Sequence, residues 1–306
     1  MTTAAALRSA RADRTRAALA DTFAQAGVEG FVHARDIDTG EEFGHGADAQ
    51  VVLASVFKIP IALEYARQAA AGRLDPALRH TVTAAYRAGG SGTDGCAYDV
   101  EMSARDLAFM MMTISDNAAT DLLLDVVGAD RVRATLDELG FPDFGFSSCA
   151  ALDDDIRHEL GLDPDRSLDD QLSGVPDARL LALRACAPGT GPSSTPRDVT
   201  ALLAAIWRDE AGPAAACAEV RDIMGQQVWQ HRLVSGFPEA GVRLAGKTGT
   251  DFAVRNEAGV VAYPDGKRYA VGVFLRTSTA VTRQPLADRA IGRAARLAVD
   301  HLRPRT

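Results

Sequence analysis

Three short motifs stand in order along the chain and contain the residue types that an activated serine requires. They are Ser55-Val-Phe-Lys58, Ser115-Asp-Asn117 and Lys247-Thr-Gly249. A serine is a weak nucleophile unless a neighbouring base takes its proton. On a helix, a three-residue offset places the Ser55 hydroxyl and the Lys58 amine on one face, within reach of a shared proton. Lys58 can act as that base if burial or a second cation, such as Lys247, lowers its pKa. The alternative is a surface lysine one turn from an incidental serine.

The second motif offers groups that can hold an amide and move a proton. Ser115 can relay a proton to a leaving nitrogen, and the Asn117 amide can both donate to and accept from a substrate amide. An apolar helix end (107–114) precedes the motif and another helical segment (118–127) follows it. We therefore expect the motif in a tight connection between two helices. The alternative role is an ordinary N-cap, which is what we expect of Asp116.

The third motif ends a strand-like run, residues 242–246, and suits a substrate carboxylate. Lys247 and Thr248 supply donors, and Gly249 permits close approach of a ligand to the backbone. A strand lysine beside a glycine is usually structural, but the conjunction with the other motifs favours binding.

Further groups around these motifs are expected to complete the site. Backbone N–H groups of Ser55 and Thr250 would form an oxyanion hole, since that task needs no particular side chain. Arg255 and Arg276 are candidates for binding a carboxylate beside Lys247, because the planar guanidinium suits it. We favour Arg255.

The elements that must position these motifs lie far apart in the sequence. Ser55 follows an apolar run and opens a helix, with Pro60 in or near its first turn, where a missing N–H costs little. Strands at both ends with helices between predict one sheet assembled from distant segments, with a helical region inserted. The expected elements are a first helix to about Ala26, a hairpin over 31–43, mainly helix over 55–140 and 197–230, strands over 257–263 and 268–275 joined by a turn, and a closing helix over 288–302.

The ordered motifs resemble class A β-lactamases and penicillin-binding proteins. The flanking segments Ala54-Ser-Val-Phe-Lys-Ile-Pro, Ser194-Thr-Pro-Arg-Asp-Val and Leu244-Ala-Gly-Lys-Thr-Gly-Thr resemble class A in particular. The resemblance covers residues 25–300 and implies an α+β fold, an antiparallel sheet flanked by helices with an inserted all-helical region. It implies a discontinuous sheet domain, 1–50 plus 200–306, and a helical domain, 51–199, with an enlarged omega-loop region at 147–195.

The resemblance also implies a reaction, in which a β-lactam, amide or ester acylates Ser55. The implied catalytic residues are Ser55, Lys58 and Ser115, and the implied substrate-binding residues are Asn117, Lys247, Thr248, Gly249, Thr250 and Arg255.

One segment departs from the resemblance. Class A enzymes carry Glu-x-x-Leu-Asn in an omega loop shortly before a Thr-Thr-x-Pro segment, and this glutamate positions the water that hydrolyses the acyl-enzyme. Counting back from Ser194-Thr-Pro196 places Arg179 at the position of the glutamate and Leu183 at that of the asparagine. An arginine stays protonated and cannot act as a base. We therefore expect slow or atypical deacylation.

The chain between the second and third motifs is also longer than the resemblance predicts, and the surplus falls between Ser147 and Pro188. Acidic residues crowd this segment, which favours a solvated acidic loop. Among them, Glu159 and Asp177 are the first candidates for a replacement base.

Composition limits the kinds of partner that we expect the protein to bind. A net charge of −8 disfavours a polyanion such as nucleic acid, and no apolar stretch approaches a membrane span. We expect a monomer that takes a small-molecule substrate. The arginine-rich first residues lack the apolar core of a signal peptide, which favours a cytoplasmic protein, or a secreted one if this is a mature form.

No cofactor or metal is expected, because the histidines and cysteines lack metal-ligand spacing. We interpret the cysteines, Cys96, Cys149, Cys186 and Cys217, as reduced thiols, with a Cys149–Cys186 bridge as the alternative.

Three functions remain open, and they differ in the fate of the acyl group. The first is a β-lactamase-like hydrolase. The second is a cytoplasmic transacylase or esterase, in which an amine or alcohol takes the acyl group. The third is a penicillin-binding or sensing module that is acylated without turnover.

Overall fold

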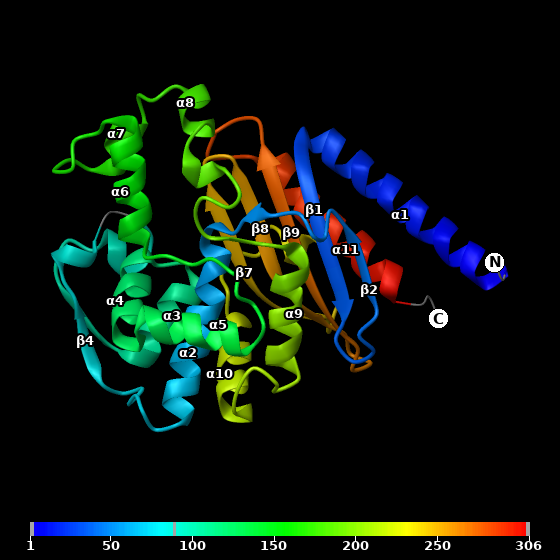
Figure 1. The fold of residues 1–306 in the computed structure, drawn as a ribbon, viewed down its shortest axis with the longest axis horizontal. Helices are drawn as coiled ribbons and strands as arrows, with labels where there is room; N and C mark the ends of the chain where they lie inside the picture. The colour runs from blue at the N-terminus through cyan, green and yellow to red at the C-terminus, as the bar shows by residue number, and fades with distance from the viewer. Residues whose placement is uncertain (1–2, 88–89, 304–306) are drawn as a thin grey trace.

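A five-stranded antiparallel sheet built from both ends of the chain forms the centre of the molecule. The computed structural model describes residues 3–87 and 90–303. The strand order is β2-β1-β9-β8-β7, and every neighbouring pair is antiparallel. The prediction of one sheet from distant segments is therefore confirmed (Figure 1). The strands are β1 (Val28–Asp36), β2 (Glu42–His45), β7 (Arg243–Asp251), β8 (Val254–Ala262) and β9 (Arg268–Thr277).

The local sequence explains the central strands. β8 and β9 are buried along nearly their whole length, which accounts for the apolar runs at 258–262 and 269–275. The predicted turn joins them, and Gly266 there has a φ of 88°, a left-handed value that glycine adopts without steric cost. β7 lies at the edge of the sheet and packs against the helical region. The third motif therefore lies where sheet and helices meet.

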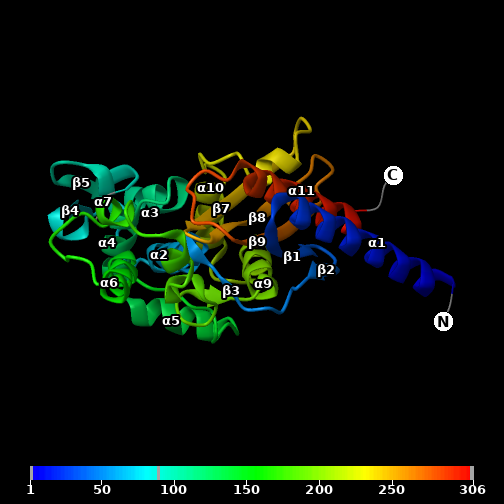
Figure 2. The same ribbon diagram turned by 90° about the horizontal axis from the view of Figure 1, so that it is seen from above.

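Helices cover both faces of the sheet. α1 (Thr3–Ala26) and α11 (Pro285–Leu302) pack together on one face, and α9 (Pro196–Trp207) packs on the other (Figure 2). Successive strand side chains alternate between the two layers, so Val273 belongs to the core under α11 and Phe274 to the core under α9. In the described part of the chain, no helix has the length and apolarity that crossing a bilayer requires.

The inserted helices surround α2, the helix that follows Ser55. α2 packs against α3, α4, α5 and α10, and its first nine residues are buried. The expectation of mainly helix over 55–140 misses a short antiparallel hairpin, because its two strands have only four residues each and little apolar alternation. The elements are α2 (Lys58–Ala70), β4 (Arg79–Val82), β5 (Val100–Ser103), α3 (Ala104–Thr113), α4 (Asn117–Val127), α5 (Ala129–Glu138) and α10 (Ala214–Met224).

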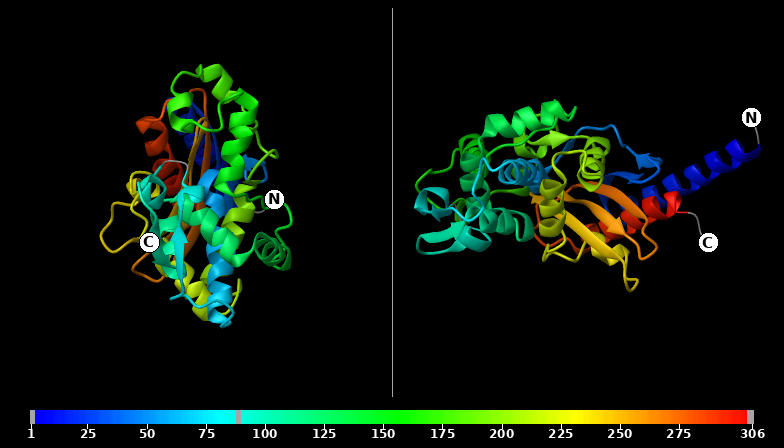
Figure 3. Two further views of the ribbon diagram at one scale, coloured as in Figure 1. Left: turned by 90° about the vertical axis from the view of Figure 1, so that its left-hand side faces the viewer. Right: turned by 90° about the horizontal axis from the view of Figure 1, so that it is seen from below.

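The surplus chain folds into helices and not into the expected acidic loop. Its apolar residues, Ile156, Leu168 and Leu180 among them, form a third small core. This region begins among the other inserted helices, at the end of the molecule opposite to α1 (Figure 3). It comprises α6 (Cys149–Leu160), α7 (Leu168–Leu172), α8 (Asp177–Leu181) and the 3-10 turn η4 (Arg184–Cys186). The remaining short elements are β3 (Val51–Val52), β6 (Ser193–Ser194), and the 3-10 turns η1 (Ala54–Phe57), η2 (Ala84–Tyr86), η3 (Gly92–Gly95) and η5 (Leu233–Gly236).

Candidate active site

The sheet holds the segment that carries Ser55. This serine lies in η1, directly before α2 begins at Lys58, so the prediction that it opens a helix is confirmed. Ala54 has a φ of 43°, a left-handed value that costs a residue with a Cβ about 1–3 kcal/mol. β7 passes so close that a Cβ on Gly249 would lie 2.5 Å from the Leu53 carbonyl oxygen. The absence of a side chain at Gly249 thus allows the backbone at Leu53 to approach β7, whereas the sequence suggested that it allows a ligand to approach.

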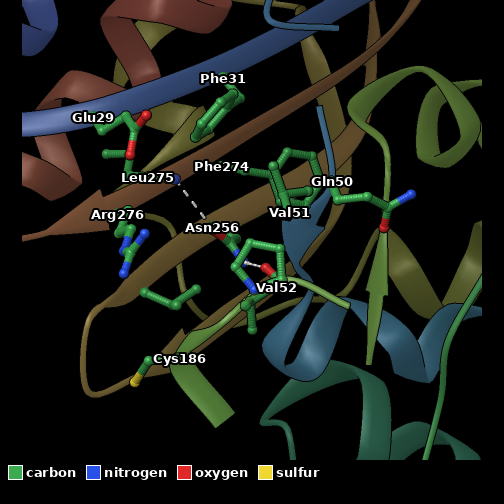
Figure 4. Close-up of a pocket in the computed structure, with 12 residues that line it drawn as sticks. Glu29, Phe31, Gln50, Val51, Val52, Cys186, Asn256, Phe274, Leu275 and Arg276 are labelled. Carbon is green, nitrogen blue, oxygen red and sulfur yellow. Dashed lines mark hydrogen bonds between the residues drawn. The ribbon is translucent and has the colours of Figure 1, made fainter. Parts of the chain in front are cut away.

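Asn256 on β8 ties the same segment to the sheet. Its Nδ2 donates to the carbonyl oxygens of Val52 at 2.8 Å and Leu53 at 3.1 Å, and its Oδ1 accepts from the Leu275 N–H at 3.2 Å. Figure 4 shows Asn256 between Val52 and Leu275. The three residues border a hollow of about 210 Å³. Arg276 borders this hollow, and the described residues that line it include none from the three motifs. Asn256 therefore helps to position Ser55 by holding the backbone that precedes it.

Lys58 points at the second motif. Its Nζ donates to the Ser115 carbonyl oxygen at 2.8 Å and to Asn117 Oδ1 at 2.7 Å, and lies 3.4 Å from Ser115 Oγ. Among the hydrogen bonds of the described residues, none joins Lys58 to Ser55; such contacts often tighten only when substrate binds. Two carbonyl acceptors match the two N–H bonds of a neutral amine. The lone pair of that amine is then available for a proton.

Ser115 lies between two lysine amines. Lys247 Nζ donates to Ser115 Oγ at 2.9 Å and to the Thr248 carbonyl oxygen at 2.9 Å. Ser115 has a φ of 65° in the tight connection between α3 and α4, as the motif predicted. Asp116 is the N-cap of α4, and its Oδ1 accepts from the Ala119 N–H at 3.0 Å. Its expected structural role is confirmed.

Burial lowers the pKa of both lysines. For Lys58, desolvation is the largest cause, and nearby Cys149 and the carboxylates of Asp116 and Asp121 oppose it. The pKa of Lys247 lies well below its usual value, because of desolvation first and repulsion from Lys58 second. A lowered pKa increases the fraction of neutral amine near pH 7, which is the form that accepts a proton. Repulsion between the two amines, which the sequence suggested, disfavours the state in which both are charged.

Two residues that the motifs do not reveal hold the third motif in place. Gln227 Oε1 accepts from the Thr248 N–H at 2.8 Å, and Gln227 Nε2 donates to Glu257 Oε1 at 2.8 Å. The other carboxylate oxygen of Glu257 accepts from the Leu233 N–H at 2.7 Å. Desolvation raises the pKa of Glu257 to about 7. No local pattern points to Gln227, because its role depends on where the loop after α10 lies against β7.

The arginine that contacts the third motif is Arg232. Its Nη2 donates to Thr250 Oγ1 at 2.8 Å, and its Nε donates to Asp288 Oδ1 at 2.8 Å. Arg255, the expected carboxylate ligand, lines the cleft but is engaged differently. Its Nη1 and Nη2 donate to four backbone carbonyl oxygens, those of Asp251, Val254, Val281 and Thr282. These bonds occupy the fork that a substrate carboxylate would need, so the structure does not support Arg255 as its ligand. Arg232 is itself held by the protein, since its Nη1 donates to the carbonyl oxygens of Gly249 and Asn256 at 2.9 Å, and its contact with the site is the bond to Thr250.

Ser55 opens into a cleft of about 340 Å³. The cleft lies between η1, the start of α4, the end of β7 and the inserted helices α6 and α7. Its walls combine apolar side chains with three carboxylates. The lining residues include Ser55, Phe57, Asn117, Cys149, Leu152, Asp153, Ile156, Leu168, Asp169, Thr250, Asp251 and Phe252.

The inserted region enters this cleft at Cys149, the first residue of α6. The two carboxylate oxygens of Asp121 accept from the Cys149 N–H at 2.6 Å and from the Ala150 N–H at 2.8 Å, which anchors the start of the helix. Desolvation raises the pKa of the Cys149 thiol to about 12, although Lys58 opposes this. A thiol, neutral at pH 7, therefore stands near Lys58. All four cysteines are unpaired as expected, and the alternative bridge to Cys186 is absent.

The positions assigned by counting back from Ser194 lie elsewhere. Arg179 is in α8, where its Nη2 donates to the Leu160 carbonyl oxygen at 3.2 Å, and Leu183 is buried in the small core of the inserted region. The assignment was wrong because much of the surplus chain lies between α6 and Ser194, so a count back from that end stops before it reaches the residues of the cleft.

The two acidic residues expected to serve as a base are bonded outside the cleft. Glu159 accepts from the Arg184 N–H at 3.1 and 3.3 Å. Asp177 Oδ2 accepts from Thr279 Oγ1 at 2.8 Å. Neither lines the cleft that contains Ser55. Asp153, which the sequence did not single out, does.

Comparison with known proteins identifies the family to which the chain belongs. A family model described as Beta-lactamase enzyme family matches residues 14–302. The chain belongs to this family. Its similarity to the Beta-lactamase regulatory protein BlaB of Streptomyces cacaoi is 27% identity over 312 residues, which covers 93% of this chain and 96% of the relative.

Solved structures of other proteins share the fold. A β-lactamase from Sphaerobacter thermophilus is 27% identical with a TM-score of 0.73, covering 94% of this chain and 98% of that one. A point mutant of PBP-A, in an acyl-enzyme complex with penicillin G, is 21% identical with a TM-score of 0.72, covering 95% and 97%. The resemblance inferred from the motifs and the predicted α+β fold are both confirmed.

Proposed function

We propose that the protein forms an acyl-enzyme on Ser55 with a β-lactam or a related amide or ester, and that it releases the acyl group slowly. The observation that supports this best is the Ser115 hydroxyl, which lies 2.9 Å from Lys247 Nζ and 3.4 Å from Lys58 Nζ beside the cleft of Ser55. Two amines of lowered pKa around one hydroxyl form a path for a proton.

Acylation follows from this arrangement. Ser55 Oγ attacks the carbonyl carbon while Lys58 takes its proton. Backbone N–H groups of Ser55 and Thr250 stabilise the oxygen on which charge develops. As the C–N bond breaks, Ser115 gives its proton to the leaving nitrogen and takes the proton held by Lys58. Both side chains return to their starting state.

Substrate binding falls to the third motif and to Asn117. Lys247, Thr248 and Thr250 face a carboxylate, and Arg232 orients the Thr250 hydroxyl through its 2.8 Å bond. The Asn117 amide meets the amide on the acyl side of the substrate. Its Oδ1 is already held by Lys58, which sets the direction of its donor group.

Slow release follows from the residues near Lys58. Water needs a base within hydrogen-bond reach to attack the ester, and the Cys149 thiol, with a pKa of about 12, stays protonated. A penicillin-binding or sensing role is the second candidate. It is supported by the same thiol and by the similarity to a protein named as a β-lactamase regulator.

Intact-protein mass spectrometry after mixing with benzylpenicillin tests the proposal. An adduct that persists supports slow release or sensing, and one that passes to an added amine or alcohol supports a transacylase or esterase. Fast turnover without an accumulating adduct would contradict slow release. The control is Ser55→Ala, and an adduct on that variant would refute the mechanism.

A further inference from the structure

Two carboxylates of the inserted region line the cleft of the nucleophile, Asp153 on α6 and Asp169 on α7. Asp153 lies on α6 one turn after Cys149, so the two side chains project from the same face of the helix. Asp153 lines the cleft that also contains Ser55, Asn117 and Thr250. Glu159 lies on the same helix but is bonded to the Arg184 N–H outside the cleft. Helix α6 therefore presents one acid to the reacting centre.

The carboxylate of Asp153 is free to act. Within the described residues it has no hydrogen bond, whereas Asp251 in the same cleft accepts from the Phe252 N–H at 2.8 Å. Desolvation raises the pKa of Asp153 to about 7, so the side chain is part carboxylate and part acid near neutral pH. The charged and titratable groups around it are Arg157 on its own helix, which lowers the pKa, and Asp94 on η3, Asp121 on α4 and Asp251 on β7, which raise it.

We propose that Asp153 is the general base that releases the acyl group from Ser55. This rests on the proposed acyl-enzyme. Asp153 takes a proton from a water molecule as the water oxygen attacks the ester carbon. The bond between that carbon and Ser55 Oγ then breaks, and the proton returns to Ser55 Oγ. The acyl group leaves as a carboxylic acid, and both side chains are regenerated.

The acid's position explains why release is slow and yet finite. The cleft residue that interacts most strongly with Lys58 is Cys149, whose thiol has a pKa of about 12 and does not act as a base at neutral pH. Asp153 is one helical turn, about 5.4 Å along the axis, further on. A water that reaches both the ester and this carboxylate is held less closely than one bound beside Lys58.

The test separates release from acylation. The acyl-enzyme is formed with benzylpenicillin, freed of excess reagent, and its decay is followed by intact mass. Asp153→Asn should be acylated at the wild-type rate but release the acyl group about 100-fold more slowly, as expected for loss of a general base. Asp153→Glu should recover part of the release rate. The matched control is Asp154→Asn, because Asp154 is an exposed neighbour on the same helix outside the cleft.

The pH dependence of acyl release distinguishes a general base from a residue with only a structural role, because a structural role of Asp153 would not change that dependence. Between about pH 5 and 9, release from the wild type should rise with pH and level off above the pKa of Asp153, because only the carboxylate accepts a proton. In Asp153→Asn that rise should be lost. Equal release rates in wild type and Asp153→Asn would overturn this inference and leave Lys58 as the base of both steps. Failure of the wild type to form any adduct would overturn the proposed function itself.

Discussion

Replacing Cys149 with glutamate should shorten the lifetime of the acyl-enzyme by about 100-fold. A positioned general base contributes about 10²–10⁴ in rate. The lower end applies because Asp153 also faces the cleft and because the carboxylate of Asp121, close to Cys149, disfavours a second negative charge. A factor of 100 corresponds to about 2.7 kcal/mol of the barrier.

The Cys149→Glu variant should still fold. The cysteine is 8% exposed and lines the 340 Å³ cleft, so a longer side chain can extend into open space. Lys58 offsets part of the cost of the added charge, and the overpacking penalty stays within about 1–3 kcal/mol. Thermal unfolding of the variant measures this cost directly.

The assay is the decay of the preformed penicillin adduct, followed by intact mass. The matched control is Cys149→Gln, which has the same length as glutamate but cannot take a proton. Fast release only in the glutamate variant supports the reasoning, and adding Asp153→Asn to it should leave that release fast. If the glutamine and glutamate variants release the acyl group at one rate, the side chain at this position does not act as a base.

Three further outcomes are expected. Truncating Asn117 or Thr248 to alanine should weaken acylation by about 1–3 kcal/mol each, the cost of an unmade buried hydrogen bond, and wild-type kinetics in both would place the cleft elsewhere. Arg232→Ala removes the bond to the Thr250 hydroxyl and should raise the KM of a carboxylate-bearing substrate, whereas Arg255→Ala should mainly lower thermal stability. A larger rise of KM in Arg255→Ala than in Arg232→Ala would restore the expectation from sequence. The pKa of Glu257 is raised from 4.5 to about 7, so the folded state holds its proton more tightly than the unfolded state. Stability should therefore fall by about 3 kcal/mol as pH rises from about 4.5 to 7, and a urea-unfolding series should lose that slope in Glu257→Gln.

Sequence alone determined the features that depend on neighbouring residues. The helix that begins at Ser55, the cap formed by Asp116 and the hairpin turn at Gly266 each follow from a few consecutive positions. Their geometry is set by backbone dihedral preferences and short-range hydrogen bonds, which a local pattern encodes. The ordered motifs also predicted the family, because their residue types are tied to one chemistry.

Only the tertiary structure decided which distant side chains meet. Lys58 bonds to Ser115 and Asn117 instead of Ser55, and Arg232 contacts the third motif where Arg255 was expected. Both choices depend on how β7 lies against the loop after α10 and against the helices, not on spacing along the chain.

The same limit explains the error in the omega-loop region. A count along the chain assumes that the inserted residues lie before the cleft, but most of them form α7, α8 and η4 after α6 has passed it. Their small apolar core made this possible, since burying Ile156, Leu168 and Leu180 together stabilises an arrangement that no local pattern specifies. The residues that α6 brings into the cleft, Cys149 and Asp153, were therefore set by packing.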